Sequence, residues 1–517
     1  MKKLISTAWL ITGVVLLSCG RNQDASLNYN INLNDRSNDE FKVTLNVSGL
    51  SDENNIYQFA ATAPGTYQTM NIGRFVRSFK AFDKKGKELQ TEKQGPNQWK
   101  LSSPEKIAKI EYRIAETWDT PVTEMEMYKM CGTSLEDDHV LFNAHCVIGY
   151  PQGLQSQPLT IKLDYPQDWK IGTALSKNEK GAYYANNFDH AVDSPILLGR
   201  LTEASADFNG TKIELFTYSK TDLIKSEDLL ESMSAMLESA NKFVVDFPVD
   251  RYTFLFHFED HNAGAWEHSY SSEYVYPEAD YAVDGGPKIT STAAHEFFHI
   301  ITPLNIHSEI IEQFNFVTPT PSDHLWLYES TTEWASDMMQ VRGGIMTVEE
   351  LLGQLRYKLR VDDYYFDSNY SLTKIAETSF SEEGQKQYSN VYYKGAVIVN
   401  MLDILLLEKS GGKKGLREVV NELSKKYGPS KAFPEDDFFN VFVEMTYPEV
   451  ADFFEKYVKN AEPLPLEEFY AKVGINFIPE KTVGEGDEAK VEKFVFEINE
   501  NANEEQLALR KAWTMNL

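Results

Sequence analysis

The spacing of apolar residues changes along this chain, and that change limits the fold more than any other feature. Between residues 28 and 200 the pattern has period two, as in residues 41–47 and 159–163, where apolar and polar side chains alternate. Turn residues such as Ala63-Pro64-Gly65 separate these runs. Alternation of this kind is typical of strands buried on one face, so we predict an antiparallel β-sandwich over residues 28–200.

Helical spacing replaces the alternation after about residue 220. Apolar residues recur at helical intervals between residues 222 and 246, and a strand is expected at 252–258. Further helices are expected at about 289–301, 324–343, 347–360, 391–408, 413–427 and 447–460. The chain is therefore predicted to be of the α+β class, with a mainly helical domain over residues 201–462. Residues 463–517 form a C-terminal tail, with one helix at 465–475 and a flexible acidic link at 484–488.

Residues 1–19 have the pattern of a bacterial export signal. Lys2 and Lys3 precede a mostly apolar stretch, residues 4–17, that is too short to span a bilayer. The stretch ends in a string similar to a lipobox, whose cysteine becomes diacylated: Leu16-Leu17-Ser18-Cys19-Gly20. An ordinary signal peptide with an incidental cysteine is the alternative. We expect an exported protein anchored to the cell envelope through Cys19, with residues 20–27 as a polar tether; Gly20 favours the outer membrane by analogy.

The net charge and the cysteine content indicate which binding partners and which disulfide bond to expect. The formal net charge is -28, from 50 basic and 78 acidic side chains, and this excess would repel nucleic-acid phosphates. We therefore expect no nucleic-acid partner. An exported context permits a disulfide between Cys131 and Cys146, and two unpaired thiols are the alternative. The sequence does not indicate the oligomeric state.

The string His295-Glu296-Phe297-Phe298-His299 carries the chemistry. Residues four apart lie on one face of a helix, so both imidazoles can bind one Zn²⁺ ion. Glu296 lies beside that face, where its carboxylate can take a proton from water activated by the metal. The alternative is a buried helix with two hydrogen-bonded histidines, so a third ligand is needed to decide.

A third ligand is expected on the second helix, residues 324–343. A histidine six positions after His299 would fit one class of zinc peptidases, but Asn305 stands there. Glu329 is the preferred ligand, and Glu333, one turn later, suits a hydrogen bond to the far nitrogen of a zinc-bound histidine. Three alternatives stay open: an exchange of the two glutamates, or ligation by His307 or His324.

This arrangement resembles the gluzincin metallopeptidases and, within them, the M61 glycyl aminopeptidase family. The matching segments are residues 188–195, 252–258, 265–268, the zinc helix, 326–334, 392–396, 452–458 and 462–465. The resemblance implies a thermolysin-like catalytic domain that hydrolyses peptides or proteins by metal-activated water. Family members often end in a PDZ domain, for which residues 463–517 are too few.

The resemblance also implies two substrate-facing residues. Tyr392 matches a tyrosine that stabilises the oxyanion, with neighbouring Tyr393 as the alternative. Glu267 matches the carboxylate that binds a substrate α-ammonium, with a solvated loop acid as the alternative. Ser330 stands where family members commonly have glycine.

Three functions remain compatible with these residues. The first is an aminopeptidase, the second an endopeptidase that uses the same zinc site, and the third an inactive lipoprotein whose sandwich binds a partner. A binding role for Glu267 would favour the first.

Overall fold

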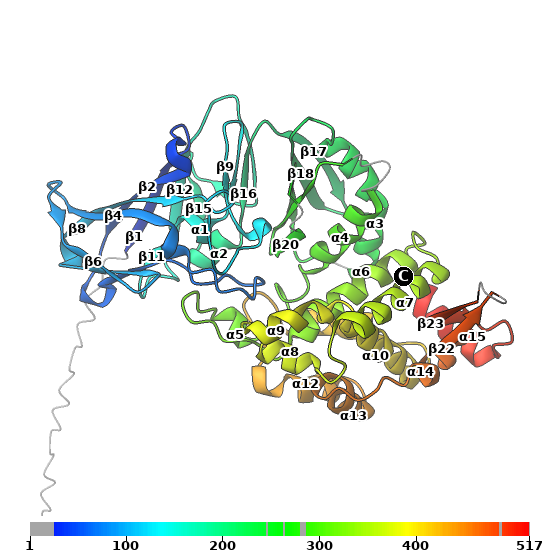
Figure 1. Cartoon of the computed structure of the whole chain (residues 1–517). Coiled ribbons are helices and arrows are strands. Elements are labelled where there is room, and N and C mark those ends of the chain that lie inside the picture. The colour runs from blue at the N-terminus through cyan, green and yellow to red at the C-terminus, as the bar shows by residue number, and fades with distance from the viewer. Residues whose placement is uncertain (1–24, 245–246, 262–263, 280–285, 485–488, 516–517) are drawn as a thin grey trace, which may run out of the picture.

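The computed structural model describes residues 25–244, 247–261, 264–279, 286–484 and 489–515 (Figure 1). Cys19, the export signal and most of the expected tether lie outside the described residues. The described chain begins with a strand-rich region, continues into a sheet covered by helices, and ends in helices and a hairpin (Figure 1). The predicted order of a β-sandwich followed by a mainly helical domain is confirmed.

The N-terminal region is built on a long sheet in the order β14-β15-β12-β1-β2-β8-β4-β5. Its strands are β1 (Ser26–Asn32), β2 (Glu40–Ser48), β4 (Val76–Asp83), β5 (Glu88–Leu89), β8 (Ile107–Ala115), β12 (Leu159–Asp164), β14 (Ser176–Lys177) and β15 (Tyr183–Ala185). The strands predicted at 41–47 and 159–163 are β2 and β12. Pairing is antiparallel except between β1 and β12, where Tyr29 lies opposite Ile161 in a parallel register. Alternate side chains of β2 are buried, as its period-two pattern requires.

Two smaller sheets complete this region. The first has the order β11-β3-β7-β6, with β3 (Ile56–Gln58), β6 (Thr91–Gln94), β7 (Gln98–Leu101) and β11 (Tyr150–Pro151). The second has the order β13-β16-β10-β9, with β9 (Ser134–Leu135), β10 (His139–Phe142), β13 (Lys170–Thr173) and β16 (Ile196–Gly199). Two short helices, α1 (Ala144–Val147) and α2 (Phe188–Val192), lie between these strands in the chain.

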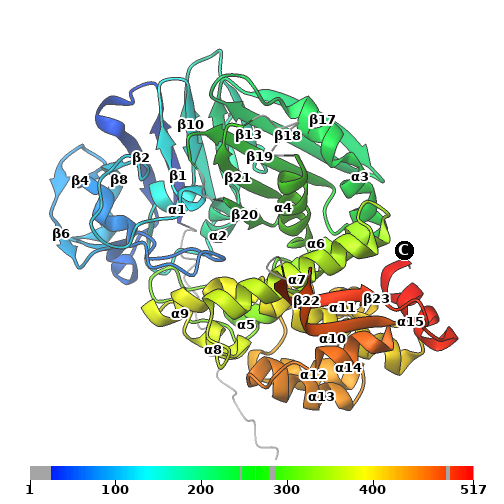
Figure 2. The ribbon, with the colours of Figure 1, turned by 45° about the vertical axis from the view of Figure 1, so that its right-hand side comes forward.

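The next domain begins with a mixed sheet in the order β17-β18-β19-β21-β20. Its strands are β17 (Thr202–Phe208), β18 (Thr211–Ser219), β19 (Arg251–Glu259), β20 (Gly264–His268) and β21 (Ser271–Pro277). Helices α3 (Ser226–Val244) and α4 (Gly286–Phe298) lie against this sheet (Figure 2). The helix predicted at 222–246 and the strand predicted at 252–258 are confirmed as α3 and β19.

The mixed sheet packs against the sheet that contains β10. Leu141 of β10 and Leu197 of β16 form a small apolar cluster with Leu255 of β19 and Val275 of β21. A side chain on Gly172 of β13 would collide with the Phe216 ring of β18, so the two sheets meet closely there. Because one face is covered by helices and the other by the sandwich, β19 is buried along nearly its whole length.

Between the mixed sheet and the C-terminal hairpin, the remaining described elements are helices. They are α5 (Glu309–Glu312), α6 (Thr331–Arg342), α7 (Val348–Tyr365), α8 (Leu372–Glu377), α9 (Glu382–Gln387), α10 (Lys394–Ser410), α11 (Leu416–Lys426), α12 (Phe438–Met445), α13 (Glu449–Phe454) and α14 (Leu466–Lys472). The helices predicted at 347–360, 391–408 and 413–427 are confirmed as α7, α10 and α11. The helix predicted at 324–343 begins instead with a π-turn, Trp326–Ser330, which leads into α6. Similarly, α13 continues as a π-turn, Glu455–Lys459.

Helix α10 is the central element of the helical bundle, and every residue from Lys394 to Leu407 is buried. Among the described residues, no single helix is long and apolar enough to cross a membrane. One pair of helical segments, Glu382–Val391 and Lys394–Ser410, is together long and apolar enough, but the two segments are bent by 43° relative to each other.

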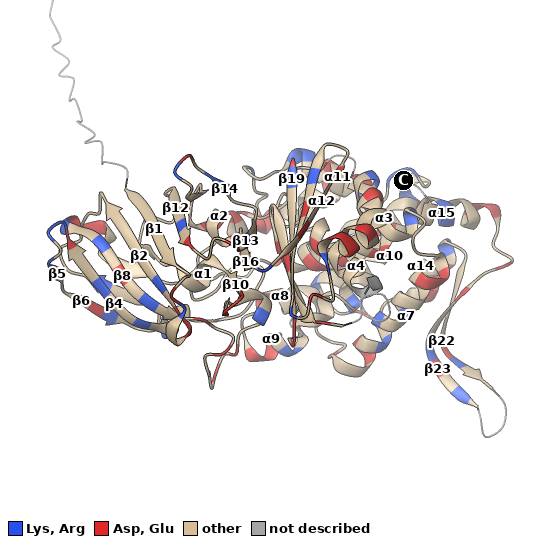
Figure 3. Cartoon of the chain, turned by 90° about the horizontal axis from the view of Figure 1, so that it is seen from above, with Lys and Arg blue, Asp and Glu red and all other residues tan. Residues whose placement is uncertain are grey.

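The segment predicted as a C-terminal tail folds onto the helical bundle. Strands β22 (Ile475–Val483) and β23 (Lys490–Ile498) pair as a hairpin, and α15 (Glu504–Met515) follows. Trp513 of α15 is fully buried and donates a hydrogen bond to Asn400 of α10 at 3.1 Å. Residues 485–488 of the expected acidic link lie outside the described residues. The hairpin strands β22 and β23 extend from the helices and carry both acidic and basic side chains (Figure 3).

Candidate metal centre and active site

Helix α4 presents the two histidines of the motif. Its buried face includes Ala293, Ala294 and Phe297, which hold the helix in the core. The helix ends at Phe298, three residues earlier than predicted, and His299 lies in the tighter turn that follows, where its N–H donates to the Glu296 carbonyl at 3.3 Å. Pro303 has no N–H to extend the helix.

His295, His299 and Glu329 converge on one point. Glu329 Oε2 lies 3.5 Å from His295 Nε2 and 3.6 Å from His299 Nε2, and all three donor atoms lie within 4.8 Å of one another. Ligands bound to one tetrahedral zinc at about 2.0–2.1 Å are separated by about 3.4 Å, so these distances suit a metal ion. The three side chains are buried. The donor set therefore fits a catalytic metal with a fourth position for water or substrate.

The far nitrogens of both rings are fixed by acceptors. His295 Nδ1 lies 2.8 Å from Glu333 Oε2, and His299 Nδ1 lies 2.8 Å from the Thr302 carbonyl. Each ring therefore carries its proton at Nδ1 and turns the Nε2 lone pair toward the site. This geometry separates the two glutamates, because Glu329 faces the Nε2 atoms and Glu333 faces the opposite side of the His295 ring.

Neither of the other candidate ligands takes part. His307 Nδ1 lies 3.1 Å from the Asn305 carbonyl. His324 Nε2 lies 2.8 Å from the Glu435 carbonyl, in an aromatic cluster that includes Phe433. Within the described residues, neither histidine belongs to a group of metal-binding donors.

Lys358 of α7 holds Glu333 in its charged form. The Lys358 ammonium bonds the second Glu333 oxygen, and both groups are buried or nearly so. Burial alone would raise the pKa of Glu333, but the positive charge of Lys358 and the contact with His295 lower it well below its usual range. An ionised Glu333 is the better acceptor for the His295 N–H.

Glu329 lies in the π-turn Trp326–Ser330, and the last residue of this turn, Ser330, holds it in place. Ser330 is fully buried, and its hydroxyl donates to the Val391 carbonyl at 2.7 Å, one residue before Tyr392. A Cβ on Gly395 would lie 2.1 Å from Ser330 Oγ, so only glycine fits there. Ser330 thus connects the turn that carries Glu329 to the segment that carries Tyr392. π-turns often occur at functional sites, because they displace a side chain from regular helical spacing.

Glu296 lies beside the donor set and can act as a base near neutral pH. Burial raises the pKa of Glu296 to about 7. The His295 ring opposes this rise, while the negative charges of Glu329 and Glu333 add to it. This pKa belongs to the metal-free site; a bound cation would lower it and favour the ionised carboxylate, which is the form that accepts a proton.

Of the two adjacent tyrosines, Tyr392 faces the metal ligands. Its ring centroid lies 5.6 Å from that of His295, and hydrogen bonding from Tyr392 is among the interactions that lower the pKa of Glu329 against the effect of burial. Tyr393 packs instead against Phe366, with ring centroids 6.0 Å apart. Of these two tyrosines, Tyr392 is therefore the one beside the metal-binding donors.

Glu267 extends from the edge strand β20 into the same site. Its carboxylate, with donor atoms of Glu296 and His299, forms a group within 4.8 Å. Burial raises the pKa of Glu267 well above its usual value, and the charges of Glu329 and Glu296 raise it further. A cation placed among these carboxylates would relieve their repulsion.

Comparison with family models decides the relationship. The model of the peptidase M61 N-terminal domain matches residues 28–200, and the model of M61 glycyl aminopeptidase matches residues 288–399, which include His295, His299 and Glu329. The chain belongs to the M61 glycyl aminopeptidase family. It is therefore a peptidase.

Solved structures show the same fold. This M61 peptidase is similar to an aminopeptidase N family protein from Idiomarina loihiensis, with a TM-score of 0.77 and 21% identity over 88% of this chain and 79% of that chain. It is also similar to a variant of an M1 zinc metallopeptidase from Deinococcus radiodurans, with a TM-score of 0.51 and 10% identity over 86% of this chain and 96% of that one. No curated protein sequence matches the chain.

In this M61 peptidase a loop of the N-terminal sandwich forms one wall of the site. Trp266, next to Glu267, donates to the Pro64 carbonyl at 3.2 Å. A Cβ on Gly65 would lie 2.4 Å from Glu267 Oε1, so the backbone of this loop rests on the carboxylate. Tyr67 packs on Tyr388, with ring centroids 5.2 Å apart. The sequence marked this segment only as a turn, and no local signal connects it with residues that follow two hundred positions later.

The sequence prediction also did not include Lys358, although its position in the predicted helix indicates a buried charge. The buried face of α7 consists of Leu351, Leu352, Leu355 and Leu359, and Lys358 falls within this stripe. A charged residue at a core position of an amphipathic helix requires charged partners, which here are the half-buried Glu333 and the buried Asp337.

A cavity of about 660 Å³ lies between the two domains. Its lining includes Pro64, next to the glycine that covers Glu267, and Pro303, next to the residue that bonds His299. Asp189, Asp193 and Glu312 also line it, and no lysine or arginine is among the described residues of its lining. Among the described residues, the metal-binding donors, Glu296, Glu267 and Tyr392 do not line this cavity, so it is a separate acidic hollow at the domain junction.

The two remaining cysteines are unpaired in this M61 peptidase. Cys131 and Cys146 are both buried thiols, and Cys146 Sγ lies 3.3 Å from the Cys131 carbonyl oxygen. Of the two alternatives that the sequence left open, the structure has unpaired thiols.

Proposed function

We propose that this M61 peptidase is a zinc-dependent aminopeptidase that removes the first residue of peptides with a free amino terminus. The convergence of His295, His299 and Glu329, with Glu296 and Glu267 in contact with the same small volume, is the observation that carries the proposal.

The residues divide the reaction among them. Bound at the three ligands, zinc would supply Lewis acidity toward a carbonyl oxygen and would lower the pKa of a water molecule. Glu296 takes a proton from the attacking water and returns it to the leaving amine. Tyr392 donates a hydrogen bond to the oxygen on which negative charge develops.

Glu267 supports cleavage at the first residue. A substrate ammonium beside Glu267 would form a charge-assisted hydrogen bond in a buried setting, where such contacts are strong. The backbone at Gly65 rests on this carboxylate and leaves little room for a residue that precedes the ammonium.

Peptides with free and acetylated amino termini distinguish an aminopeptidase from an endopeptidase. We expect acetylation to lower kcat/KM at least a hundredfold for the wild-type protein. Glu267→Gln should lower kcat/KM for the free peptide and leave the acetylated peptide as poor as before. Glu309→Gln, a change of an exposed glutamate, is the matched control and should alter neither value. Equal cleavage of both peptides by the wild-type protein would favour an endopeptidase, and no cleavage of any peptide by zinc-loaded protein would favour an inactive binding protein.

We also propose that the protein is exported and held in the outer membrane by a lipid on Cys19. The strand β1 begins at Ser26, so the intervening residues could span at most about 25 Å and would keep the sandwich close to the membrane. Palmitate labelling of cells tests this proposal. Cys19→Ser should lose the label and leave the membrane fraction, while the buried Cys131→Ser should keep both. Retained label in Cys19→Ser would contradict the anchor.

A further inference from the structure

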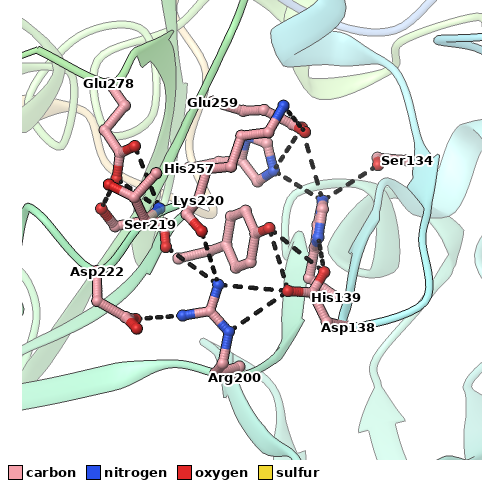
Figure 4. Close-up of polar contacts among 12 residues, drawn as sticks. Ser134, Asp138, His139, Arg200, Ser219, Lys220, Asp222, His257, Glu259 and Glu278 are labelled. Atoms are coloured by element: carbon pink, nitrogen blue, oxygen red, sulfur yellow. Dashed lines mark hydrogen bonds and ion pairs between the residues drawn. The ribbon is translucent and has the colours of Figure 1, made fainter.

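A second group of metal-binding side chains lies where the N-terminal sandwich meets the mixed sheet. It consists of His139 from β10 and of His257 and Glu259 from β19 (Figure 4). The two Nε2 atoms are 3.0 Å apart, and Glu259 Oε2 lies 3.9 Å from that of His139 and 3.8 Å from that of His257. Both rings are 1% exposed, and the glutamate side chain is 15% exposed.

These distances leave room for one metal ion. A triangle with sides of 3.0, 3.8 and 3.9 Å has a centre about 2.1 Å from each corner, which is the length of a zinc–nitrogen or zinc–oxygen bond. Two imidazoles and one carboxylate are also the donor set of the candidate catalytic centre. Ser134 Oγ, 3.4 Å from His139 Nε2, or a water molecule would supply a fourth donor.

The proton on His139 is placed as a metal ligand requires. His139 Nδ1 lies 2.9 Å from Asp138 Oδ1, and a carboxylate can only accept, so the ring proton is at Nδ1 and the Nε2 lone pair faces Glu259 and His257. Asp138 in turn accepts a hydrogen bond from Arg200 at 3.3 Å (Figure 4). It accepts another from the Tyr218 hydroxyl, also at 3.3 Å. The same carboxylate–imidazole arrangement orients His295 at the catalytic centre.

The donors are also held rigidly. The Tyr218 ring stacks on His139 with centroids 3.8 Å apart and on His257 with centroids 5.0 Å apart. Trp118 packs edge-on against His257 at 4.9 Å. Lys220 contacts the other Glu259 oxygen at 3.3 Å, which leaves Oε2 directed at the two rings. A preorganised donor set loses little conformational entropy when an ion binds.

We propose that His139, His257 and Glu259 form a second divalent-metal site that takes an ion of the zinc class and joins the sandwich to the catalytic domain. One ligand comes from the sandwich and two come from the mixed sheet, so a bound ion resists separation of the two sheets. The loop at Gly65 belongs to the same sandwich, and the ion would therefore also stabilise the wall that rests on Glu267.

Metal stoichiometry of the purified full-length protein tests the proposal. After loading with zinc and dialysis against metal-free buffer, we expect two equivalents per wild-type chain by mass spectrometry. His139→Gln, Glu259→Gln and His299→Ala should each bind one equivalent, and His139→Gln combined with His299→Ala should bind none. His190→Gln, a histidine outside both groups, is the control and should bind two.

The absorption spectrum of bound Co²⁺ can report on the second site alone when the first site is removed by substitution. In the His299→Ala protein, one equivalent of Co²⁺ should give the intense visible bands of a four-coordinate ion, and adding Glu259→Gln should weaken cobalt affinity at least tenfold. Glu259 is partly exposed, and glutamine has nearly the same size as glutamate. The Glu259→Gln variant therefore tests the second metal site even if His139→Gln does not fold. One zinc equivalent in the wild-type protein, lost in His299→Ala and unchanged in Glu259→Gln, would overturn the site and leave a hydrogen bond between two neutral rings. It would leave the catalytic proposal intact.

Discussion

Gly395→Ala tests how the turn that carries the third ligand is packed. The new Cβ would lie 2.1 Å from Ser330 Oγ and 2.8 Å from Ser330 Cβ, both shorter than real contacts allow. Ser330 cannot swing away, because it is fully buried and bonded to the Val391 carbonyl. Overpacking costs about 1–3 kcal/mol, and alanine in place of helical glycine returns about 1 kcal/mol at most. We expect a net loss of up to about 2 kcal/mol. We also expect weaker metal binding, because Glu329 shares the displaced turn.

A second substitution isolates this contact. Ser330→Gly removes both clashing atoms, so Gly395→Ala in that background should be neutral or stabilising by up to about 1 kcal/mol. Urea unfolding of the metal-free proteins measures the four free energies of unfolding. Gly353→Ala is the control, because open space surrounds that helical position, and it should not destabilise the protein. If Gly395→Ala costs the same free energy in the wild-type background and in the Ser330→Gly background, the packing argument is refuted.

Three further predictions concern the groups around the metal ligands. Glu333→Gln should weaken metal affinity about 10–100-fold in a chelator competition, because the His295 ring loses a charged acceptor, and unchanged affinity would contradict that role. Tyr392→Phe should lower kcat about 10²–10³-fold with little change in KM, whereas the control Tyr393→Phe should match the wild type; equal losses would contradict the assignment of the oxyanion donor. The pKa of Glu333 is lower in the folded protein than near 4.3 when unfolded, so its stabilisation is present above that pH and is lost as the pH falls. Metal-free wild-type protein should thus lose stability between about pH 5 and 3 more steeply than Glu333→Gln in chemical unfolding, and parallel curves would contradict this sign.

The sequence predicted those features that depend on local spacing. The period-two pattern of β2 and the helical spacing of α3 follow directly from which side chains must be buried. The pair His295 and His299 is likewise local, since four residues make about one helical turn. Glu329 and Glu333 could not be separated in this way, because both face the same side of a regular helix. The π-turn at Trp326–Ser330 breaks that regularity and directs only Glu329 to the Nε2 atoms.

Features that depend on the meeting of distant segments could not be predicted. The loop at Gly65 reaches Glu267 only after the sandwich has docked on the mixed sheet. His139 and His257 meet across the same junction and carry no shared motif. The C-terminal hairpin could not be predicted for another reason. Strand β22 has exposed charged residues and only weak alternation of burial, so its sequence lacks a clear strand pattern.

The most direct test of the account is metal content and hydrolysis measured on the same preparation of Glu296→Gln. His295, His299 and Glu329 are unchanged in this variant, so it should bind as much metal as the wild-type protein. The loss of the proton acceptor should lower kcat for a peptide with a free amino terminus by about 10²–10⁴. Wild-type activity in the metal-loaded variant would contradict the role of Glu296, and wild-type activity in metal-free protein would contradict the metal centre itself.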